Sequence, residues 1–163
     1  MLGMATTTSV PVAEYLSSSY DPDVDFVEGE IEDRNVGEKD HAKVQFRVAR
    51  LLDTGQWFVT IETRLRISPT RYRVPDVCVY ENEPEEQVFT TAPWIVIEVL
   101  SPEDRMSRMQ RKMEDYHAIG CPNIWILDPW RRKAYRYDGT SIVDVPLLAT
   151  SDSRVSLSVS QIF

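Results

Sequence analysis

The sequence predicts an α+β domain in which a mixed β-sheet is flanked by helices, and three observations support this fold class. Residues 40–53 and 107–119 carry apolar side chains at helical spacing. Short runs rich in β-branched and aromatic residues lie before, between and after these two segments, as expected of strands. The chain has 163 residues, of which 42% are hydrophobic and 27% charged, which is typical of one globular domain.

Local signals give the boundaries of the elements. Residues 1–10 are small and polar, so we expect a flexible N-terminus followed by a single domain over residues 11–163. A short helix is expected over residues 9–16 with Ser9 as its cap, and Gly120 ends the helix over residues 107–119. The two main helices lie either on opposite faces of the sheet or together on one face. The expected strands form a pair within residues 26–34 and then cover residues 57–67, 71–80, 94–100, 123–127, 133–137, 141–145 and 155–163.

Composition argues against several classes of protein. No apolar run approaches the roughly 20 residues of a membrane helix, and the first ten residues lack the pattern of a secretion signal, so we expect a cytoplasmic protein. Cys78 and Cys121 are not spaced as metal ligands and are expected to be free thiols, and with two histidines in the chain a zinc site is not expected. The formal charge of −8 opposes strong non-specific binding to nucleic acid, although acidic metal ligands would add to this charge.

Two carboxylates lie in runs that are otherwise apolar. Asp76 stands in Val-Pro-Asp-Val-Cys-Val-Tyr (residues 74–80), and Glu98 stands in Trp-Ile-Val-Ile-Glu-Val-Leu (residues 94–100). A charged carboxylate inside a buried strand is costly unless it is paired or neutralised, and two of them on adjacent strands repel each other. A divalent cation between them removes both costs, and hard oxygen ligands suit Mg²⁺ or Mn²⁺.

The same residues also permit a structure without a metal. One of the two carboxyl groups could be protonated, or Arg71, Arg73 or Lys112 could pair with them. Burial of the carboxylates does not by itself decide between a metal site and an internal ion pair.

Four motifs together resemble a known family. They are Arg-Val-Pro-Asp-Val at 73–77, Ile-Val-Ile-Glu-Val-Leu-Ser-Pro-Glu-Asp-Arg at 95–105, Lys-x-x-x-Tyr-x-x-x-Gly at 112–120, and Ile-Trp-Ile-Leu-Asp-Pro at 124–129. In this order and spacing they resemble the Uma2 family, a group of restriction-endonuclease-like proteins within the PD-(D/E)XK nuclease superfamily. The resemblance runs from Val12 to Phe163 and implies a restriction-endonuclease-like central mixed β-sheet flanked by helices.

The resemblance also implies a role for individual residues. Asp76 matches the aspartate of the PD motif and Glu98 the acidic residue of the second motif, and both are metal ligands. The backbone carbonyl of Val99 completes the set, and Glu30 matches an upstream acidic residue that binds the metal directly or through water. The implied cofactor is Mg²⁺ or Mn²⁺, and the implied activity is hydrolysis of DNA phosphodiester bonds.

The sequence departs from the superfamily pattern at the catalytic lysine. Leu100 stands where that lysine is expected, and the resemblance implies that Lys112, on the following helix, replaces it. Lys112 flanks the apolar stripe of its helix, so its ammonium group can reach back over the sheet or extend into solvent. In the first case it orients the attacking water or stabilises the transition state by its charge.

Other polar and aromatic residues receive weaker assignments. We expect Ser101 beside the site, as a helix cap or a phosphate contact, and His41 as an exposed residue of the first turn of its helix. Glu62 is expected in a cross-strand ion pair. The tryptophans are expected in the core or in dimer contacts rather than as platforms for base stacking.

Two other functions remain open from the sequence. Leu100 and the negative charge also fit a nuclease-fold protein that no longer cleaves and serves as a homodimeric interaction module. A structural homodimer, with the two carboxylates paired to Arg71 or Arg73, is the third possibility.

Overall fold

The structure is a computed structural model that describes residues 9–34 and 38–163. Most of the N-terminal segment expected to be flexible, residues 1–8, lies outside the described residues. At the end of that segment, the N–H of Val10 donates a hydrogen bond to the carbonyl of Gly29, with a distance of 2.8 Å. Val10 is therefore fixed to the rest of the chain.

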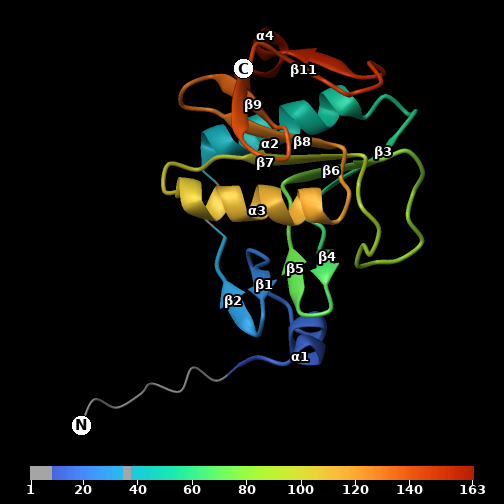
Figure 1. The fold of residues 1–163 in the computed structure, drawn as a ribbon, viewed down its shortest axis with the longest axis vertical. Helices are drawn as coiled ribbons and strands as arrows, with labels where there is room; N and C mark the ends of the chain where they lie inside the picture. The colour runs from blue at the N-terminus through green and yellow to red at the C-terminus, as the bar shows by residue number, and fades with distance from the viewer. Residues whose placement is uncertain (1–8, 35–37) are drawn as a thin grey trace.

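A six-stranded mixed sheet forms the centre of the molecule (Figure 1). Its strands follow the order β10-β9-β8-β7-β6-β3, and neighbours are antiparallel except for the parallel pair β7 and β8. The chain crosses between these two through helix α3 (Met106–Ala118), because parallel strands require a long connection. The strands are β3 (Phe58–Ile61), β6 (Val77–Tyr80), β7 (Ile95–Val99), β8 (Asn123–Asp128), β9 (Lys133–Tyr137) and β10 (Ile142–Val145).

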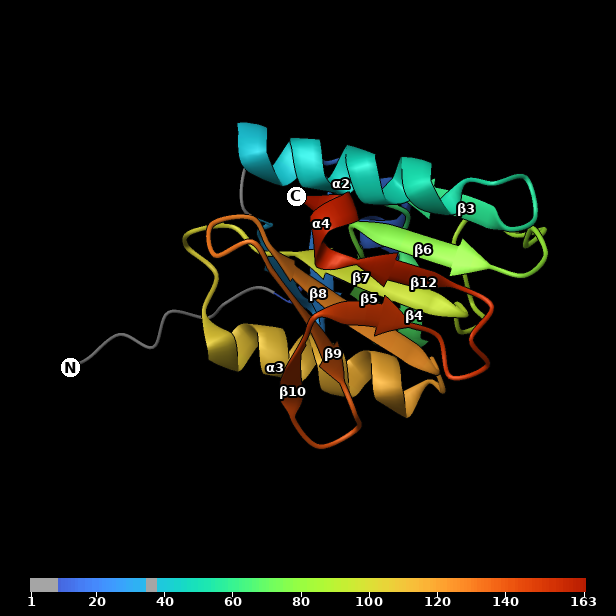
Figure 2. The ribbon, with the colours of Figure 1, turned by 90° about the horizontal axis from the view of Figure 1, so that it is seen from above.

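One helix covers each face of this sheet, which decides between the two arrangements expected from the sequence (Figure 2). Helix α2 (Lys39–Leu52) packs Val48 and Leu52 on the face that carries Ile95 and Ile97. Helix α3 packs on the opposite face, which carries Val96. Because side chains alternate along a strand, Glu98 points to the same side as Val96, toward α3.

A four-stranded antiparallel sheet, in the order β2-β1-β5-β4, lies on the α3 side of the central sheet, opposite to α2 (Figure 1). It has an apolar cluster of its own, in which the rings of Tyr15, Phe26 and Tyr72 contact one another. Tyr15 belongs to the short helix α1 (Val12–Ser17), whose N-cap is Pro11 and not the expected Ser9. The strands are β1 (Asp25–Val27), β2 (Glu30–Glu32), β4 (Leu65–Ser68) and β5 (Arg71–Arg73).

A bent hairpin connects the two sheets, and here the expected strands need correction. Residues 57–67 and 71–80 are each divided in two, since β3 pairs with β6 in the large sheet and β4 pairs with β5 in the small one. The breaks fall at Glu62, which has φ 48°, and beside Pro75, which has no N–H to give to a ladder. Asp76 therefore lies at the bend, one residue before β6, and not inside a strand.

The C-terminal part also differs from the expectation of a last strand and tail over residues 155–163, because a helix follows the strand. It forms β12 (Ser156–Ser158) and then helix α4 (Val159–Ile162). The partner of β12 is β11 (Leu147–Ala149), which the sequence pattern did not predict. Within residues 9–34 and 38–163, none of the helices has the length and apolar character needed to cross a membrane.

We expect the central sheet to dominate stability. Leu127 of β8 is fully buried, so Leu127→Ala should lower the free energy of unfolding by about 2–5 kcal/mol through lost burial and a residual cavity. Leu147→Ala is the matched control, because Leu147 is 47% exposed and its loss should change stability by less than about 0.5 kcal/mol. Urea denaturation followed by tryptophan fluorescence measures both, and equal effects would contradict this account of the core.

Candidate active site

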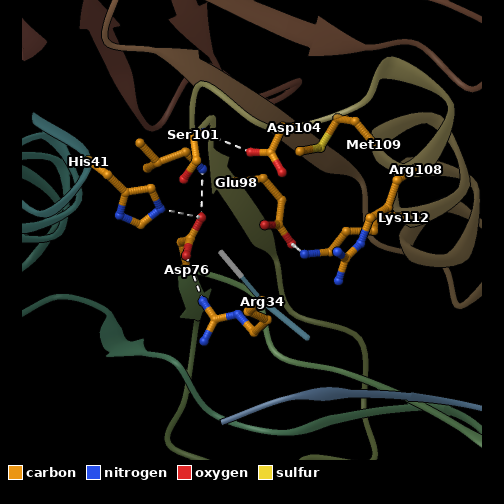
Figure 3. Close-up of a pocket in the computed structure, with 10 residues that line it drawn as sticks. Arg34, His41, Asp76, Glu98, Ser101, Asp104, Arg108, Met109 and Lys112 are labelled. Atoms are coloured by element: carbon orange, nitrogen blue, oxygen red, sulfur yellow. Dashed lines mark hydrogen bonds and ion pairs between the residues drawn. The ribbon is translucent and has the colours of Figure 1, made fainter. Parts of the chain in front are cut away.

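A small polar pocket lies between the start of α2, the bend at Asp76 and the first turns of α3 (Figure 3). Its volume of about 30 Å³ is enough for roughly two water molecules. Segments that are far apart in the sequence supply its walls. The lining residues are Arg34, His41, Asp76, Glu98, Val99, Ser101, Asp104, Arg108, Met109 and Lys112.

The pairing of β6 with β7 brings the two carboxylates together. Val77 lies opposite Ile97, so Asp76 and Glu98, one position further along each strand, face each other across the ladder. Both are 3% exposed. One oxygen of Asp76, Oδ2, accepts the backbone N–H of Val99 at 2.7 Å, which locks the aspartate onto the neighbouring strand.

Cationic groups neutralise Asp76. The guanidinium of Arg34 lies 2.7 Å from Oδ1, and Nε2 of His41 lies 3.4 Å from Oδ2. Burial raises the pKa of Asp76, but the hydrogen bond from His41 and the charge of Arg34 outweigh it, so the pKa is lowered. Asp76 is therefore charged at neutral pH.

His41 does not have the exposed position expected from the sequence. Its side chain is 11% exposed and faces Asp76 from the first turn of α2. Burial lowers the pKa of His41, but the hydrogen bond to Asp76 and the charges of Asp76 and Glu98 together outweigh burial, and the net pKa lies above the ordinary value. Glu62 does not form the cross-strand ion pair expected from the sequence. It accepts a hydrogen bond from Gln45 at 3.3 Å and lies 3.9 Å from Arg34.

Helix α3 neutralises Glu98 from the other face of the sheet. Lys112 and Tyr116, one helical turn apart, both direct their polar ends at Oε1 of Glu98, and the ammonium nitrogen lies 2.8 Å from it. Lys112 is 6% exposed, so its side chain reaches back over the sheet and does not extend into solvent. Burial raises the pKa of Glu98 to about 7, although the charge of Lys112 opposes this shift.

A second layer of charge lies behind Lys112. Its nitrogen is 3.7 Å from Asp25 of β1, whose carboxylate is fully buried and also lies 3.3 Å from Arg73. Arg73 in turn contacts Asp115 of α3 at 2.7 Å. Arg71 likewise pairs with Asp115, and it also pairs with Glu28 in the turn between β1 and β2. Arg71 and Arg73 therefore do not neutralise Asp76 and Glu98, which was one of the possibilities left open by the sequence.

The remaining expected residues divide into those at the pocket and those away from it. Val99 lines the pocket, as does Ser101, which is buried and donates its N–H to Asp104 at 2.6 Å. Ser101 does not cap α3, whose N-cap is Arg105. Glu30 is exposed at the start of β2 and is not among the residues that line the pocket.

Arg34, Asp25 and Tyr116 contact the site residues but were not predicted from the sequence as part of the site. A signal for Asp25 was present, because it stands between apolar residues in Val-Asp-Phe-Val in the same way as Asp76. The spacing of Tyr116 four positions after Lys112 was a second signal, since it places both on one face of the helix.

The oxygen donors of the pocket fit a hydrated hard cation. Mg²⁺ usually retains several waters and binds through one or two carboxylates, which Asp76 and Glu98 supply. Within the described residues, no three His, Cys, Asp or Glu side chains form a group that could hold a metal ion. A cation would therefore depend on water and backbone oxygen as further ligands, and it would have to displace Arg34 from Asp76.

The fold and the pocket define a restriction-endonuclease-like α+β protein. A sequence model of the Uma2 family, described as "Putative restriction endonuclease", matches residues 12–159, and the chain belongs to this family. The crystal structure of "a putative nuclease belonging to DUF820" from Anabaena variabilis is similar in fold, with a TM-score of 0.80, 20% identity, and coverage of 94% of this chain and 97% of that one. None of the curated proteins matches the chain. Family and fold together support a nuclease function in general terms.

Burial of Glu98 predicts an unusual dependence of stability on pH. The folded protein holds the Glu98 proton up to a pH of about 7, whereas the unfolded chain releases it near 4.5, so the free energy of unfolding should fall as the pH rises through this interval. The shift corresponds to about 3 kcal/mol. Glu98→Gln has no such proton, so its stability should vary less.

Urea denaturation at several pH values across this interval measures the difference between the two proteins. Glu85→Gln, at an exposed position in the loop before β7, is the control and should follow the wild type. Parallel pH profiles for the wild type and Glu98→Gln would contradict the raised pKa.

Proposed function

We propose that the protein is a Mg²⁺- or Mn²⁺-dependent endonuclease that hydrolyses phosphodiester bonds of DNA in the pocket of Asp76 and Glu98. The observation that carries this proposal is the convergence of three buried charged groups, the two carboxylates and Lys112, on one water-sized pocket. Lysine beside paired carboxylates suits metal-assisted phosphodiester hydrolysis, because the carboxylates can hold the cation and the lysine can stabilise negative charge on the phosphate.

Asp76 and Glu98 would hold the cation, with the carbonyl of Val99 and water as further ligands. The bound cation would activate a water molecule as the nucleophile and stabilise charge on the scissile phosphate. Arg34, once displaced from Asp76, remains at the pocket and can pair with phosphate oxygens through its planar guanidinium.

The chain's own cations then act on the phosphate. Lys112 stays protonated because Asp25 and Glu98 raise its pKa more than burial lowers it, and its fixed charge opposes the negative charge that develops in the transition state. Arg108 lines the same pocket with 27% of its side chain exposed, which suits a contact to the backbone of the substrate. His41 holds Asp76 in its orientation.

Replacing the pocket residues should abolish cleavage, and circular dichroism of each variant separates this loss from a loss of folding. We expect Asp76→Asn and Lys112→Met each to reduce nicking of supercoiled plasmid by at least about 100-fold, because each removes a group that acts on the metal or the phosphate. Wild-type cleavage should require Mg²⁺ or Mn²⁺ and stop with EDTA. Asp144→Asn, in an exposed ion pair of β10, is the control and should retain activity. If Asp76→Asn cleaves DNA at the wild-type rate, the assignment of this pocket as the active site is wrong.

A non-cleaving interaction module, acting as a homodimer, is the second candidate. The ion pairs of Asp76 with Arg34 and of Glu98 with Lys112 favour it, because they neutralise both carboxylates without a metal.

Calorimetric titration with Mn²⁺ separates the two candidates. The endonuclease should bind the ion, Asp76→Asn should lose this binding, and Arg34→Gln should bind more tightly because a competing cation has been removed. Absence of binding at millimolar Mn²⁺ in both the wild type and Arg34→Gln would instead support the interaction module.

A further inference from the structure

A wider groove lies beside the reaction pocket, along the N-terminal turn of α3. The two share Ser101, Asp104 and Met109 as lining residues, so they adjoin each other. The groove has a volume of about 580 Å³, which lies within the roughly 300–1,000 Å³ of ligand-binding pockets. Its other lining residues are Leu100, Pro102, Arg105, Met106, Asp128, Trp130 and Arg131.

The groove lies at the carboxyl ends of the parallel strands. Leu100 directly follows β7, and Asp128 is the last residue of β8. In open α/β sheets, ligands bind in the crevice outside the carboxyl ends of the strands, because the connecting segments diverge there. Since Glu98 stands near the same end of β7, a molecule in the groove would lie directly beside the reaction pocket.

The surface of the groove is apolar and exposed. Trp130 and Met106 both line the groove and are 58% and 62% exposed, so together they present apolar surface to solvent. A turn fixes Trp130, because Oδ1 of the buried Asp128 accepts the backbone N–H groups of Trp130 and Arg131 at 3.0 Å each. These hydrogen bonds fix the backbone of the turn that presents Trp130 at the groove.

The charged residues that line the groove are two aspartates and two arginines. Asp128 accepts hydrogen bonds from the turn and from the guanidinium of Arg131, and Asp104 accepts the N–H of Ser101. Arg105 and Arg131 remain exposed to solvent. Arg105 can contact a phosphate of a nucleotide whose base lies against the exposed indole of Trp130, since arginine and aromatic side chains are the groups that bind single-stranded nucleic acid.

We propose that this groove binds the nucleotide next to the scissile phosphate, with its base unstacked from its neighbours and placed against Trp130. The inference rests on the proposed nuclease function and extends it, since the substrate must then be single-stranded or opened at the cut. Stacking on an indole tolerates any base, so the groove gives a preference for strand state and not for sequence.

Binding of short fluorescein-labelled DNA tests the groove separately from the reaction. Fluorescence anisotropy with Ca²⁺ in place of Mg²⁺ measures the affinity for a single-stranded oligonucleotide and for the corresponding duplex, and cleavage assays with Mg²⁺ give KM and kcat. Trp130→Leu and Met106→Ala remove the platform at exposed positions. Phe46→Leu is the matched control, because Phe46 is 68% exposed on α2 and does not line the groove.

We expect the wild type to bind the single strand more tightly than the duplex. Trp130→Leu should weaken single-strand binding about tenfold and raise KM with little change in kcat, whereas Phe46→Leu should match the wild type. If Trp130→Leu binds the single strand with an affinity within twofold of the wild type, the proposed nucleotide site in the groove is overturned, while the proposed nuclease function is not affected. If the wild type is a dimer without DNA and Trp130→Leu is a monomer, the groove is a contact between two copies of the chain, and the proposed nucleotide site is overturned. If the wild type neither binds nor cuts DNA, the nuclease function itself fails.

Discussion

Two carboxylates buried side by side, Asp76 and Glu98, impose the arrangement of charge in this molecule. Each needs donors to offset the loss of water, and the donors come from both faces of the central sheet. Helix α2 and the segment before it serve Asp76, while α3 serves Glu98. At Glu98 the effect of burial on the pKa is larger than that of the paired cations, whereas at Asp76 the paired cations have the larger effect. The two pKa values are therefore shifted in opposite directions, up at Glu98 and down at Asp76. One group remains an anion while its neighbour accepts a proton easily.

The bent hairpin makes this proximity possible. A straight pair of strands would extend the ladder past Asp76, and the aspartate would point into a packed face. The break at Pro75 and Glu62 turns the chain into a second sheet instead, which leaves space at the bend for a pocket. Asp25, on strand β1 of the small sheet, lies behind this pocket and contacts Lys112 there.

The sequence predicted the features that depend on local patterns. Helices α2 and α3 and the strands of the central sheet follow from periodicity, and family motifs indicated Asp76, Glu98 and Lys112. Contacts between distant segments were not visible, as with Arg34, which lies 42 positions before Asp76. Glu30 illustrates a different reason why a site residue could not be predicted correctly from the sequence. It shares a face of β2 with Glu32, but two residues along a strand advance about 6.6 Å, so it is Glu32 that contacts Arg73 and Glu30 that lies at the exposed turn.

The junction between the small sheet and α3 makes the N-terminal region integral to the site. Arg73 joins Asp25 of β1 to Asp115 of α3, and all three are buried, so removal of one partner leaves the others as uncompensated charges. A chain shortened to begin at α2 would keep the central sheet and both covering helices. It would nevertheless lose Asp25 from behind Lys112 and Arg34 from Asp76. The N-terminal region is thus part of the structure that holds the pocket and not a dispensable extension of it.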